Sequence, residues 1–430
     1  MELLRKLDAR LAAGNPVRVG IIGCGQMGSG LAHTIKNIRG MQVQAIADIN
    51  PERAIKTFAD MGIPETSIRV TDKSGEANDF LKQGKFIVTP DSLLMTQLDL
   101  IDANVEVTGI TDVGARVAMA SIEQRKPIIM MNVETDVTIG AYLNHLARKN
   151  NSLYTVASGD EPGVCKMLYE QAVLMGFEVV CVGKCKNNPV DFDATPENCA
   201  DEAASKDMNP KVLASFRDGT KTMVEMAVVS NSTGLIADIP GMHGPRVDLE
   251  DLLRFFIPEN DGGILTQSGC VDYSTGNFAP GVFVIVRSHD ARIRKDMYFI
   301  TKAKGPYYLL YRPYHLCDIE TPQSIAEAVL LNEITVAADT MHSEVITVAK
   351  RNIRKGEKIK GIGSADIYGR IYKYSEARAA GLIPLGIAEN GIAKSDIQKG
   401  DLFTKDNLMP DTTAFIYKLR KEQDQLLNHE

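Results

Sequence analysis

The chain has 430 residues, of which 44% are hydrophobic and 24% are charged, and these proportions are typical of a soluble globular protein. Lys and Arg total 48 against 55 Asp and Glu, and the net charge of -7 argues against a nucleic-acid-binding surface. No apolar run approaches the roughly 18 residues that a membrane span needs, and residues 1–16 lack a signal-peptide core. We therefore expect a cytoplasmic protein of two or three domains that has no nucleic-acid or membrane partner.

The seven cysteines are an odd number and are scattered along the chain, which predicts reduced thiols and not a disulfide framework. Cys181 and Cys185 have a spacing that a metal site could use. However, no second pair of Cys or His residues lies at zinc-site spacing. We expect buried thiols at these positions.

The first part of the chain alternates predicted strands with predicted helices. The strands are predicted at residues 17–22, 41–48, 104–108, 127–131 and 153–157, and the helices at 27–38, 51–61, 113–124 and 137–149. Regular alternation of this kind is typical of an α/β fold with a doubly wound parallel sheet. We therefore predict that residues 1–157 form a dinucleotide-binding domain of the Rossmann type.

The rest of the chain is less regular. Strand-like segments at residues 177–182, 282–287 and 297–302 lie between helical stretches, which predicts an α+β substrate-binding domain over residues 158–342. Its last helix is predicted at residues 322–334. Beyond it, residues 350–359 and 394–403 share a pattern. In each segment, an apolar residue precedes a turn that contains a basic residue, a glycine and an acidic residue. This weak duplication predicts a small β-rich C-terminal domain over residues 343–430.

A glycine-rich turn lies directly after the first predicted strand and opens the first helix of the alternating region. Gly23 permits a tight turn, Gly25 lets the backbone approach a pyrophosphate, and Gly28 lets helix and strand pack closely. Gln26 and Met27 begin the helix, whose N-terminal amides favour phosphate groups. We expect this turn to bind NAD(P)(H); the alternative is a glycine turn that binds nothing.

The second predicted strand ends at Asp48, 20 positions after Gly28. A carboxylate there accepts hydrogen bonds from the ribose hydroxyls and repels a 2′-phosphate, which favours NAD. Arg53 follows one helical turn later and could pair with that phosphate, so NADP stays open.

Further cofactor contacts are expected where later strands of the same sheet end, because open α/β sheets bind ligands at the carboxyl ends of their strands. Thr108 and Gly109 follow one such strand, and Asn132 and Glu134 follow the next. These residues could line the nicotinamide half of the site. The alternative is that they serve only the turns.

Three polar clusters interrupt apolar surroundings on the substrate side. Asp160 and Glu161 lie between a strand and a helix, where they could cap the helix or hold a divalent ion such as Mg²⁺ or Mn²⁺. Lys184 and Lys186 lie at the end of a strand, where they could bind an anionic substrate.

The third cluster places Lys221 four residues before Glu225, a spacing that also suits an intrahelical ion pair. Hydride transfer requires a group that handles the substrate proton, and a lysine can do this when its neighbours or burial lower its pKa. We therefore predict catalytic roles in this set: Lys184, Lys186, Lys221, Asp160, Glu161 and Glu225. Which lysine enters the pocket stays open.

Taken together, these motifs resemble two related families. The N-terminal half is similar to homoserine dehydrogenase, and nearly the whole chain resembles the 1-deoxy-D-xylulose-5-phosphate reductoisomerase-like family, whose members carry a C-terminal SAF module. The segments that carry the resemblance are residues 132–136, 159–162, 183–184, 218–221, 225–226, 231–234 and 313–316.

The resemblance implies an NADPH-dependent rearrangement and reduction of a phosphorylated ketose with a divalent cation, and a homodimer or higher oligomer. It also places Pro322 at the nucleotide site, at the start of a helix that returns to the nucleotide domain. We therefore expect an NAD(P)-dependent oxidoreductase acting on a small hydroxylated carbonyl compound or sugar phosphate. The alternatives are a dehydrogenase of the homoserine type and a nucleotide-binding sensor without turnover.

Overall fold

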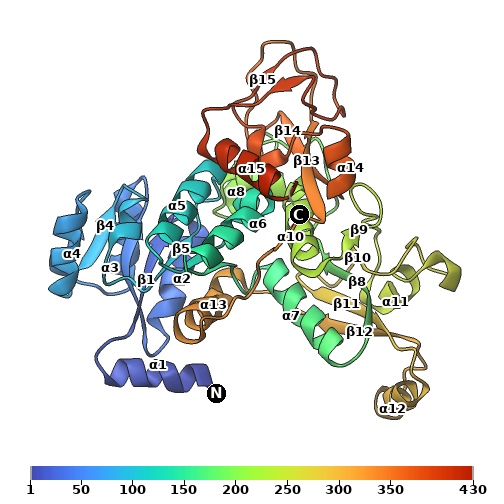
Figure 1. Ribbon diagram of the computed structural model, residues 1–430, viewed down its shortest axis with the longest axis horizontal. Helices are drawn as coiled ribbons and strands as arrows, with labels where there is room; N and C mark the ends of the chain where they lie inside the picture. Colours follow the sequence, from blue (N-terminus) through green and yellow to red (C-terminus); the bar gives the residue numbers. More distant parts are fainter. Residues whose placement is uncertain (1, 429–430) are drawn as a thin grey trace. The chain divides into compact units, whose positions relative to one another are not determined.

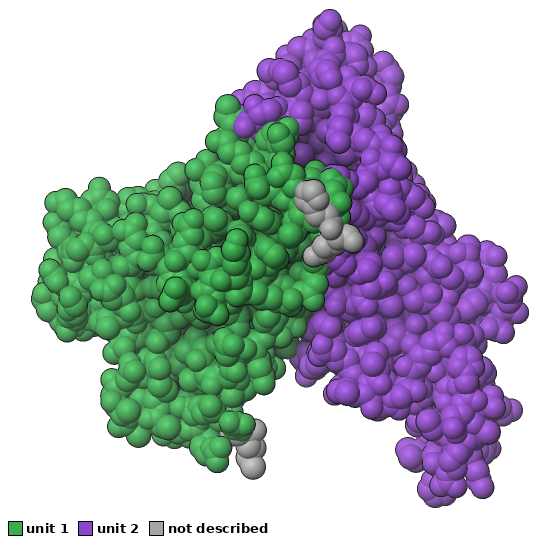
Figure 2. Space-filling view, viewed as in Figure 1, with its two compact units in different colours: residues 1–160, 316–339, 413–430 green, residues 161–315, 340–412 purple. Residues whose placement is uncertain are grey.

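The computed structural model describes residues 2–428 and divides the chain into two compact units (Figure 2). Unit 1 contains residues 1–160, 316–339 and 413–430, and unit 2 contains residues 161–315 and 340–412. Neither unit is one continuous segment, because the chain passes between them several times. The three-part division expected from the sequence stays a prediction.

Unit 1 is built on a seven-stranded sheet with the order β3-β4-β2-β1-β5-β6-β7, and every pairing in it is parallel. Its strands are β1 (Val17–Ile22), β2 (Met41–Ala47), β3 (Ile68–Val70), β4 (Phe86–Thr89), β5 (Ala103–Glu106), β6 (Ile128–Met130) and β7 (Tyr154–Val156). The prediction of a doubly wound parallel sheet is confirmed. The short strands β3 and β4, however, did not feature in it.

The helices of unit 1 include one that comes from far along the chain. They are α1 (Glu2–Ala12), α2 (Gln26–Lys36), α3 (Pro51–Asp60), α4 (Ser74–Lys82), α5 (Thr111–Glu123), α6 (Val133–Lys149), α13 (Cys317–Leu331) and α15 (Phe415–Leu426), with 3-10 turns at Glu65–Ser67 and Leu94–Gln97. Helix α13 packs against α2, and its Asp318 carboxylate lies where a side chain at Gly30 would project. The helix that follows the glycine turn is thereby held from outside the N-terminal segment.

Unit 2 contains a mixed five-stranded sheet with the order β12-β11-β8-β10-β9. Its strands are β8 (Glu178–Cys185), β9 (Ile236–Ala237), β10 (Cys270–Ser274), β11 (Val282–Arg287) and β12 (Tyr307–Arg312). Helices α7 (Glu161–Leu174) and α10 (Thr220–Thr233) pack against each other and against this sheet (Figure 1). Glu161, at the start of α7, and Glu225, in α10, thereby reach Lys184 of strand β8.

The remaining elements of unit 2 are short. They are α8 (Ala200–Ser205), α9 (Pro210–Arg217), α11 (Leu252–Phe255), α12 (Ala291–Thr301), α14 (Tyr374–Ala379), the paired strands β13 (Ser343–Ala349) and β14 (Ile367–Lys373), the paired strands β15 (Ile392–Ala393) and β16 (Leu408–Met409), and 3-10 turns at Leu249–Asp251, Glu259–Asp261 and Leu385–Ile387.

One strand prediction in this unit is wrong. Residues 297–302, predicted as a strand, belong mostly to helix α12. The Asp290 side chain caps that helix by accepting hydrogen bonds from the backbone N–H groups of Arg292 at 2.7 Å and Ile293 at 3.0 Å. This local cap outweighs the strand preference of the aromatic and branched residues that follow.

The duplicated C-terminal segments pair with each other. Ile353 and Ile397 exchange backbone hydrogen bonds of 2.8 and 2.9 Å. Each is followed by the same turn, in which a backbone N–H donates to an acidic side chain: Arg354 to Glu357 and Gln398 to Asp401, both at 2.9 Å. The repeat in the sequence is therefore a repeat in structure, while a SAF module stays a prediction.

Two general expectations can be compared with the described residues. All seven cysteines are free thiols, and all except Cys317 are buried. Within residues 2–428, no helix combines the length and apolar character required to cross a bilayer.

Candidate functional site

The three glycines of the turn in unit 1 differ in the space around them. Gly23 has a φ of +101°, which favours glycine, and a Cβ placed on Gly28 would lie 2.0 Å from the Gly23 carbonyl oxygen. A Cβ placed on Gly25 would meet no atom within 4 Å. The turn is thus tightly packed at Gly23 and Gly28 and leaves free space at Gly25, the position expected to face a pyrophosphate.

Helix α2 begins directly at this turn. Gly25 is its N-cap, Gln26 and Met27 form its exposed start, and no side chain among the described residues caps it. Uncapped amides at a helix start attract anions, so these residues fit the phosphates of a dinucleotide.

Asp48 has a more internal position than the sequence suggested. It is only 8% exposed, its Oδ2 accepts the Cys24 N–H at 2.7 Å, and its Oδ1 accepts the Asn50 N–H at 2.8 Å. Its carboxylate therefore ties the glycine turn to the end of β2. Arg53 lies exposed on α3, and the choice between NAD and NADP stays a prediction.

Asn132 and Glu134 lie at the start of helix α6. Asn132 is its N-cap and accepts the Thr135 N–H at 3.1 Å, while its amide donates to the Ile110 carbonyl at 3.2 Å. Asn132 therefore links α6 to the segment that follows Thr108 and Gly109. A direct contact of these residues with a cofactor stays a prediction, as it does for Pro322, which is buried within α13.

A further carboxyl group lies at this end of the sheet and was missed from the sequence. Glu106, the last residue of β5, is fully buried, and its Oε1 accepts hydrogen bonds from the Thr108 backbone N–H at 3.0 Å and from the Thr108 hydroxyl. Burial raises the pKa of Glu106 to about 7. An acidic residue inside an apolar strand was the signal that could have identified it.

Unit 2 brings three of the predicted catalytic residues into contact. The Lys184 ammonium group donates hydrogen bonds to Glu161 at the start of α7 and to Glu225 in α10. All three side chains are at least nine-tenths buried. His315, which the sequence analysis did not select, places its Nε2 3.2 Å from Glu161 Oε1.

The two carboxylates determine the charge of Lys184. Burial alone disfavours its charged form, but Glu161 and Glu225 outweigh that effect and raise the pKa of Lys184. Lys184 therefore remains an ammonium ion throughout the neutral range.

Lys186 lies two residues further along the chain, just after the end of β8. Its Nζ donates to the carbonyl oxygen of Asn188 at 2.8 Å and to the Asn188 side chain at 2.5 Å. Burial, together with the charge of Lys184, lowers the pKa of Lys186 to about 8. An amine in this state can accept a proton near neutral pH.

The two other predicted catalytic residues are Lys221 and Asp160. Lys221 is half-buried in the first turn of α10, one turn before Glu225. Asp160 is a buried residue of unit 1 that directly precedes Glu161. A metal ion held by Asp160 and Glu161 stays a prediction, and in the structure the Glu161 carboxylate already has Lys184 as its cation.

Comparison with known families gives one match. Residues 159–321 match the family model described as "Oxidoreductase DRL, catalytic domain". This range contains Glu161, Lys184, Lys186 and Glu225. No curated protein matches the chain.

Several solved structures are similar to parts of the chain at low identity. A probable dehydrogenase from Thermotoga maritima is 12% identical, with a TM-score of 0.44, and the match covers 75% of this chain and 91% of that one. A scyllo-inositol dehydrogenase from Lactobacillus casei, solved with NAD(H) and scyllo-inositol, is 12% identical, with a TM-score of 0.44 and coverage of 75% and 92%. An oxidoreductase from Agrobacterium radiobacter, in complex with NAD+, L-tartaric acid and magnesium, is 12% identical, with a TM-score of 0.37 and coverage of 63% and 71%.

The family match corrects the resemblance drawn from the sequence. The matching model is that of an oxidoreductase DRL catalytic domain, and residues 159–321 include several of the segments on which the resemblance rested. The assignment to 1-deoxy-D-xylulose-5-phosphate reductoisomerase-like proteins or to homoserine dehydrogenase is therefore wrong. The broader prediction of an oxidoreductase is confirmed by the family match.

Proposed function

We propose that the chain is an NAD(P)-dependent dehydrogenase that interconverts a hydroxyl and a carbonyl group on a small, anionic, hydroxylated compound. The observation that carries this proposal is the pair of neighbouring buried lysines, of which Lys184 is held as a cation and Lys186 is poised to exchange a proton. The match of this part of the chain to an oxidoreductase catalytic domain supports it.

The nucleotide requirement is supported by unit 1 on its own. The space at Gly25 and the uncapped start of α2 fit a pyrophosphate, and the Asp48 carboxylate fixes the turn that presents them. A bound nicotinamide nucleotide supplies the hydride acceptor of an oxidation. Both NAD and NADP remain candidates.

The proton requirement is supported by unit 2. In the direction of oxidation, a carbinol loses a hydride from carbon and a proton from its hydroxyl group. We assign the proton to the neutral amine of Lys186, because its pKa of about 8 lies near the working pH. We assign to Lys184 the role of a fixed donor that stabilises negative charge on the substrate oxygen.

An anionic substrate is proposed from the chemistry of the lysines in unit 2. Lys184 and Lys186 are buried at the end of β8, and Lys221 follows in the first turn of α10. A lysine ammonium group binds a carboxylate or phosphate through charge-assisted hydrogen bonds. Self-association into a homodimer stays a prediction.

The test is a screen for turnover with purified protein. Sugar phosphates, plain polyols and hydroxy acids are mixed with NAD+ or NADP+, and formation of the reduced nucleotide is followed by its absorbance. We expect at least one anionic substrate to be oxidised, and we expect Lys186→Arg to abolish that oxidation while nucleotide affinity stays within about twofold. Nucleotide binding without oxidation of any compound would instead indicate a sensor.

A further inference from the structure

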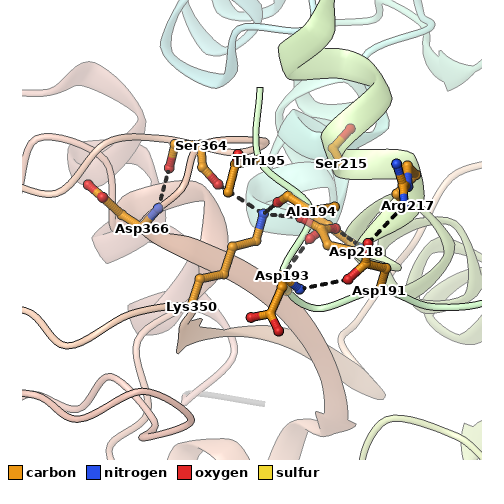
Figure 3. Close-up of polar contacts among 12 residues, drawn as sticks. Asp191, Asp193, Ala194, Thr195, Ser215, Arg217, Asp218, Lys350, Ser364 and Asp366 are labelled. Atoms are coloured by element: carbon orange, nitrogen blue, oxygen red, sulfur yellow. Dashed lines mark hydrogen bonds and ion pairs between the residues drawn. The ribbon is translucent and has the colours of Figure 1, made fainter. Parts of the chain in front are cut away.

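Residues 340–412 make a buried contact with the segment that leads into helix α10. Lys350 lies directly after β13, and its ammonium group points toward Ala194 and Asp218 (Figure 3). This group lies 2.6 Å from Asp218 Oδ2 and donates hydrogen bonds to the carbonyl oxygens of Ala194 at 2.7 Å and Ser364 at 2.9 Å. The Lys350 side chain is 2% exposed and that of Asp218 is 0% exposed.

Asp218 in turn fixes the start of α10. Its Oδ1 accepts the Thr220 N–H at 2.8 Å, and between them Gly219 has a φ of +83°, a conformation that other residues rarely adopt. The Thr220 hydroxyl oxygen accepts the Gly369 N–H of β14 at 2.9 Å. Two independent contacts from residues 340–412 therefore hold the first turn of α10.

The segment before α10 is also bound to the chain that follows β8. The Asp191 N–H donates to the Arg217 carbonyl oxygen at 2.9 Å, and the Arg217 guanidinium donates to the Asp191 carboxylate at 2.9 Å (Figure 3). The negative charge of Asp218 opposes the lowering of the pKa of Lys186, the lysine to which we assign proton transfer.

We propose that Lys350 is a positioning residue of the substrate site, which acts through Asp218 to fix helix α10 and with it Lys221 and Glu225. Residues 340–412 are in this view an integral part of the site and not an appended module. The inference deepens the proposed function and rests on it.

Removal of one partner of a buried ion pair strongly destabilises a protein, because the other partner is left as an uncompensated buried charge. The Lys350 ammonium group is also oriented by two hydrogen bonds, which it donates to the carbonyl oxygens of Ala194 and Ser364 beside its ion pair with Asp218. A small displacement of a catalytic group can cost on the order of a hundredfold in rate, so a rigid anchor at this turn has a functional consequence.

The test compares wild type with three single variants, Lys350→Met, Lys350→Arg and Asp218→Asn. It also includes a double variant that combines Lys350→Met and Asp218→Asn. Lys399→Met is the matched control, because Lys399 also pairs with an aspartate, Asp193, from the segment after β8, but both side chains are exposed. Four quantities are measured on the full-length protein: the thermal midpoint, NADPH and NADH affinity, deuterium uptake of residues 218–226, and kcat and KM for the substrate found in the turnover screen.

In Lys350→Met, we expect the backbone amides of residues 218–226 to take up deuterium about tenfold faster than in wild type. We also expect kcat/KM to fall by about tenfold to a hundredfold. Nucleotide affinity should stay within about twofold, and Lys350→Arg should recover most of the loss. The double variant should regain thermal stability, because no charge is left unpaired, without regaining kcat/KM. This separation distinguishes positioning from a purely structural role.

Wild-type exchange and kinetics in a folded Lys350→Met protein would overturn the inference, as would a double variant that recovers full activity. If Lys350→Met does not fold, the same comparison is made with Lys350→Arg and Asp218→Asn. If the wild type oxidises nothing, the proposed function fails, whereas the exchange of residues 218–226 still decides whether Lys350 holds this turn.

Discussion

Lys184 lies in β8 and Lys186 follows just after the end of that strand, yet their surroundings shift their pKa values in opposite directions. Glu161 and Glu225 overcome the effect of burial and raise the pKa of Lys184. Burial and the charge of Lys184 lower the pKa of Lys186 to about 8. One lysine is therefore suited to hold positive charge, and the other is suited to transfer a proton.

The first prediction concerns the pH dependence of oxidation. Because Lys186 must be neutral to accept a proton, the rate should rise with pH through about 8 and then level off. Lys186→Arg remains protonated, so it should lose this limb and about 10² to 10⁴ in kcat. Lys206→Arg, an exposed substitution that keeps the charge, serves as the control. A Lys186→Arg enzyme with an unchanged pH profile would remove Lys186 from the mechanism.

The second prediction concerns the stability of the Lys184 cluster. Lys184→Met leaves Glu161 and Glu225 buried without their cation, and the free energy of unfolding should fall by about 3–5 kcal/mol in urea titrations. Combining it with Glu161→Gln and Glu225→Gln removes the stranded charges and should recover part of that loss.

The matched control for this cluster is Lys56→Met. Lys56 forms an exposed pair with Asp60, so its loss should change the free energy of unfolding by no more than about 0.5 kcal/mol. Equal effects of Lys184→Met and Lys56→Met would contradict the assigned burial of the cluster.

Much of unit 1 could be predicted from the sequence. The strands β1 and β2 and the helix between them follow from continuous branched residues and a glycine turn, and α3 begins where Asn50 and Pro51 indicated. The strands β3 and β4 were missed although β5, β6 and β7 are no longer than β4. β3 is an edge strand in which only Ile68 is buried, so it lacks the continuous buried apolar run by which the other strands were predicted. The prediction at residues 297–302 failed because it used the side chains of the segment and overlooked the cap at Asp290.

The sequence predicted which residues belong to the candidate site, but it did not predict which of them contact one another. Glu161, Lys184 and Glu225 were selected separately because charged residues are unusual in apolar surroundings. Their contacts span 23 and 41 positions of sequence, and such contacts depend on how α7 and α10 pack on β8. The contact of Glu225 with Lys184 was not suggested by the spacing of Lys221 and Glu225, and an ion pair between those two residues stays a prediction.

The third prediction concerns Glu106. Its pKa of about 7 lies above the ordinary value of 4.5, so the folded protein holds this proton more tightly than the unfolded chain does. The stability of the wild type should therefore fall relative to Glu106→Gln between about pH 4.5 and pH 7, by about 3 kcal/mol in total. Gln can still accept the hydrogen bonds from Thr108.

Urea titrations at several pH values measure this difference, with Glu52→Gln as an exposed control on α3. If the difference in the free energy of unfolding between wild type and Glu106→Gln stayed constant across this pH range, the prediction would be wrong. Such a result would show that Glu106 ionises as easily in the folded state as in the unfolded chain.

The fourth prediction concerns His243, whose Nδ1 lies 2.7 Å from Asp272 Oδ2 and whose Nε2 lies 3.6 Å from Asp238 Oδ2. The hydrogen bond with Asp272 raises the pKa of His243 above 6.5. The stabilisation from the imidazolium is thus complete below about pH 6.5 and is lost as the pH rises through the higher folded pKa. The advantage of wild type over His243→Gln in urea titrations should shrink from pH 6 to pH 9; an advantage that grows with pH would refute the assignment.

The fifth prediction separates packing from binding in the glycine turn. Gly28→Ala places a Cβ 2.0 Å from the Gly23 carbonyl oxygen, so the variant should unfold at a markedly lower temperature. Gly25→Val enters free space at a residue with a φ of -77°, which any residue can adopt, so its thermal midpoint should stay near that of wild type. Because the new side chain occupies the phosphate position, Gly25→Val should nevertheless lose nucleotide affinity.

The most direct measurement is therefore a fluorescence titration of wild type and Gly25→Val with NADH and with NADPH. We predict saturable binding of at least one nucleotide to wild type and a loss of at least about tenfold in affinity in the folded Gly25→Val variant. Absence of saturable binding to wild type, or equal affinity in both proteins, would contradict a nicotinamide nucleotide at this turn.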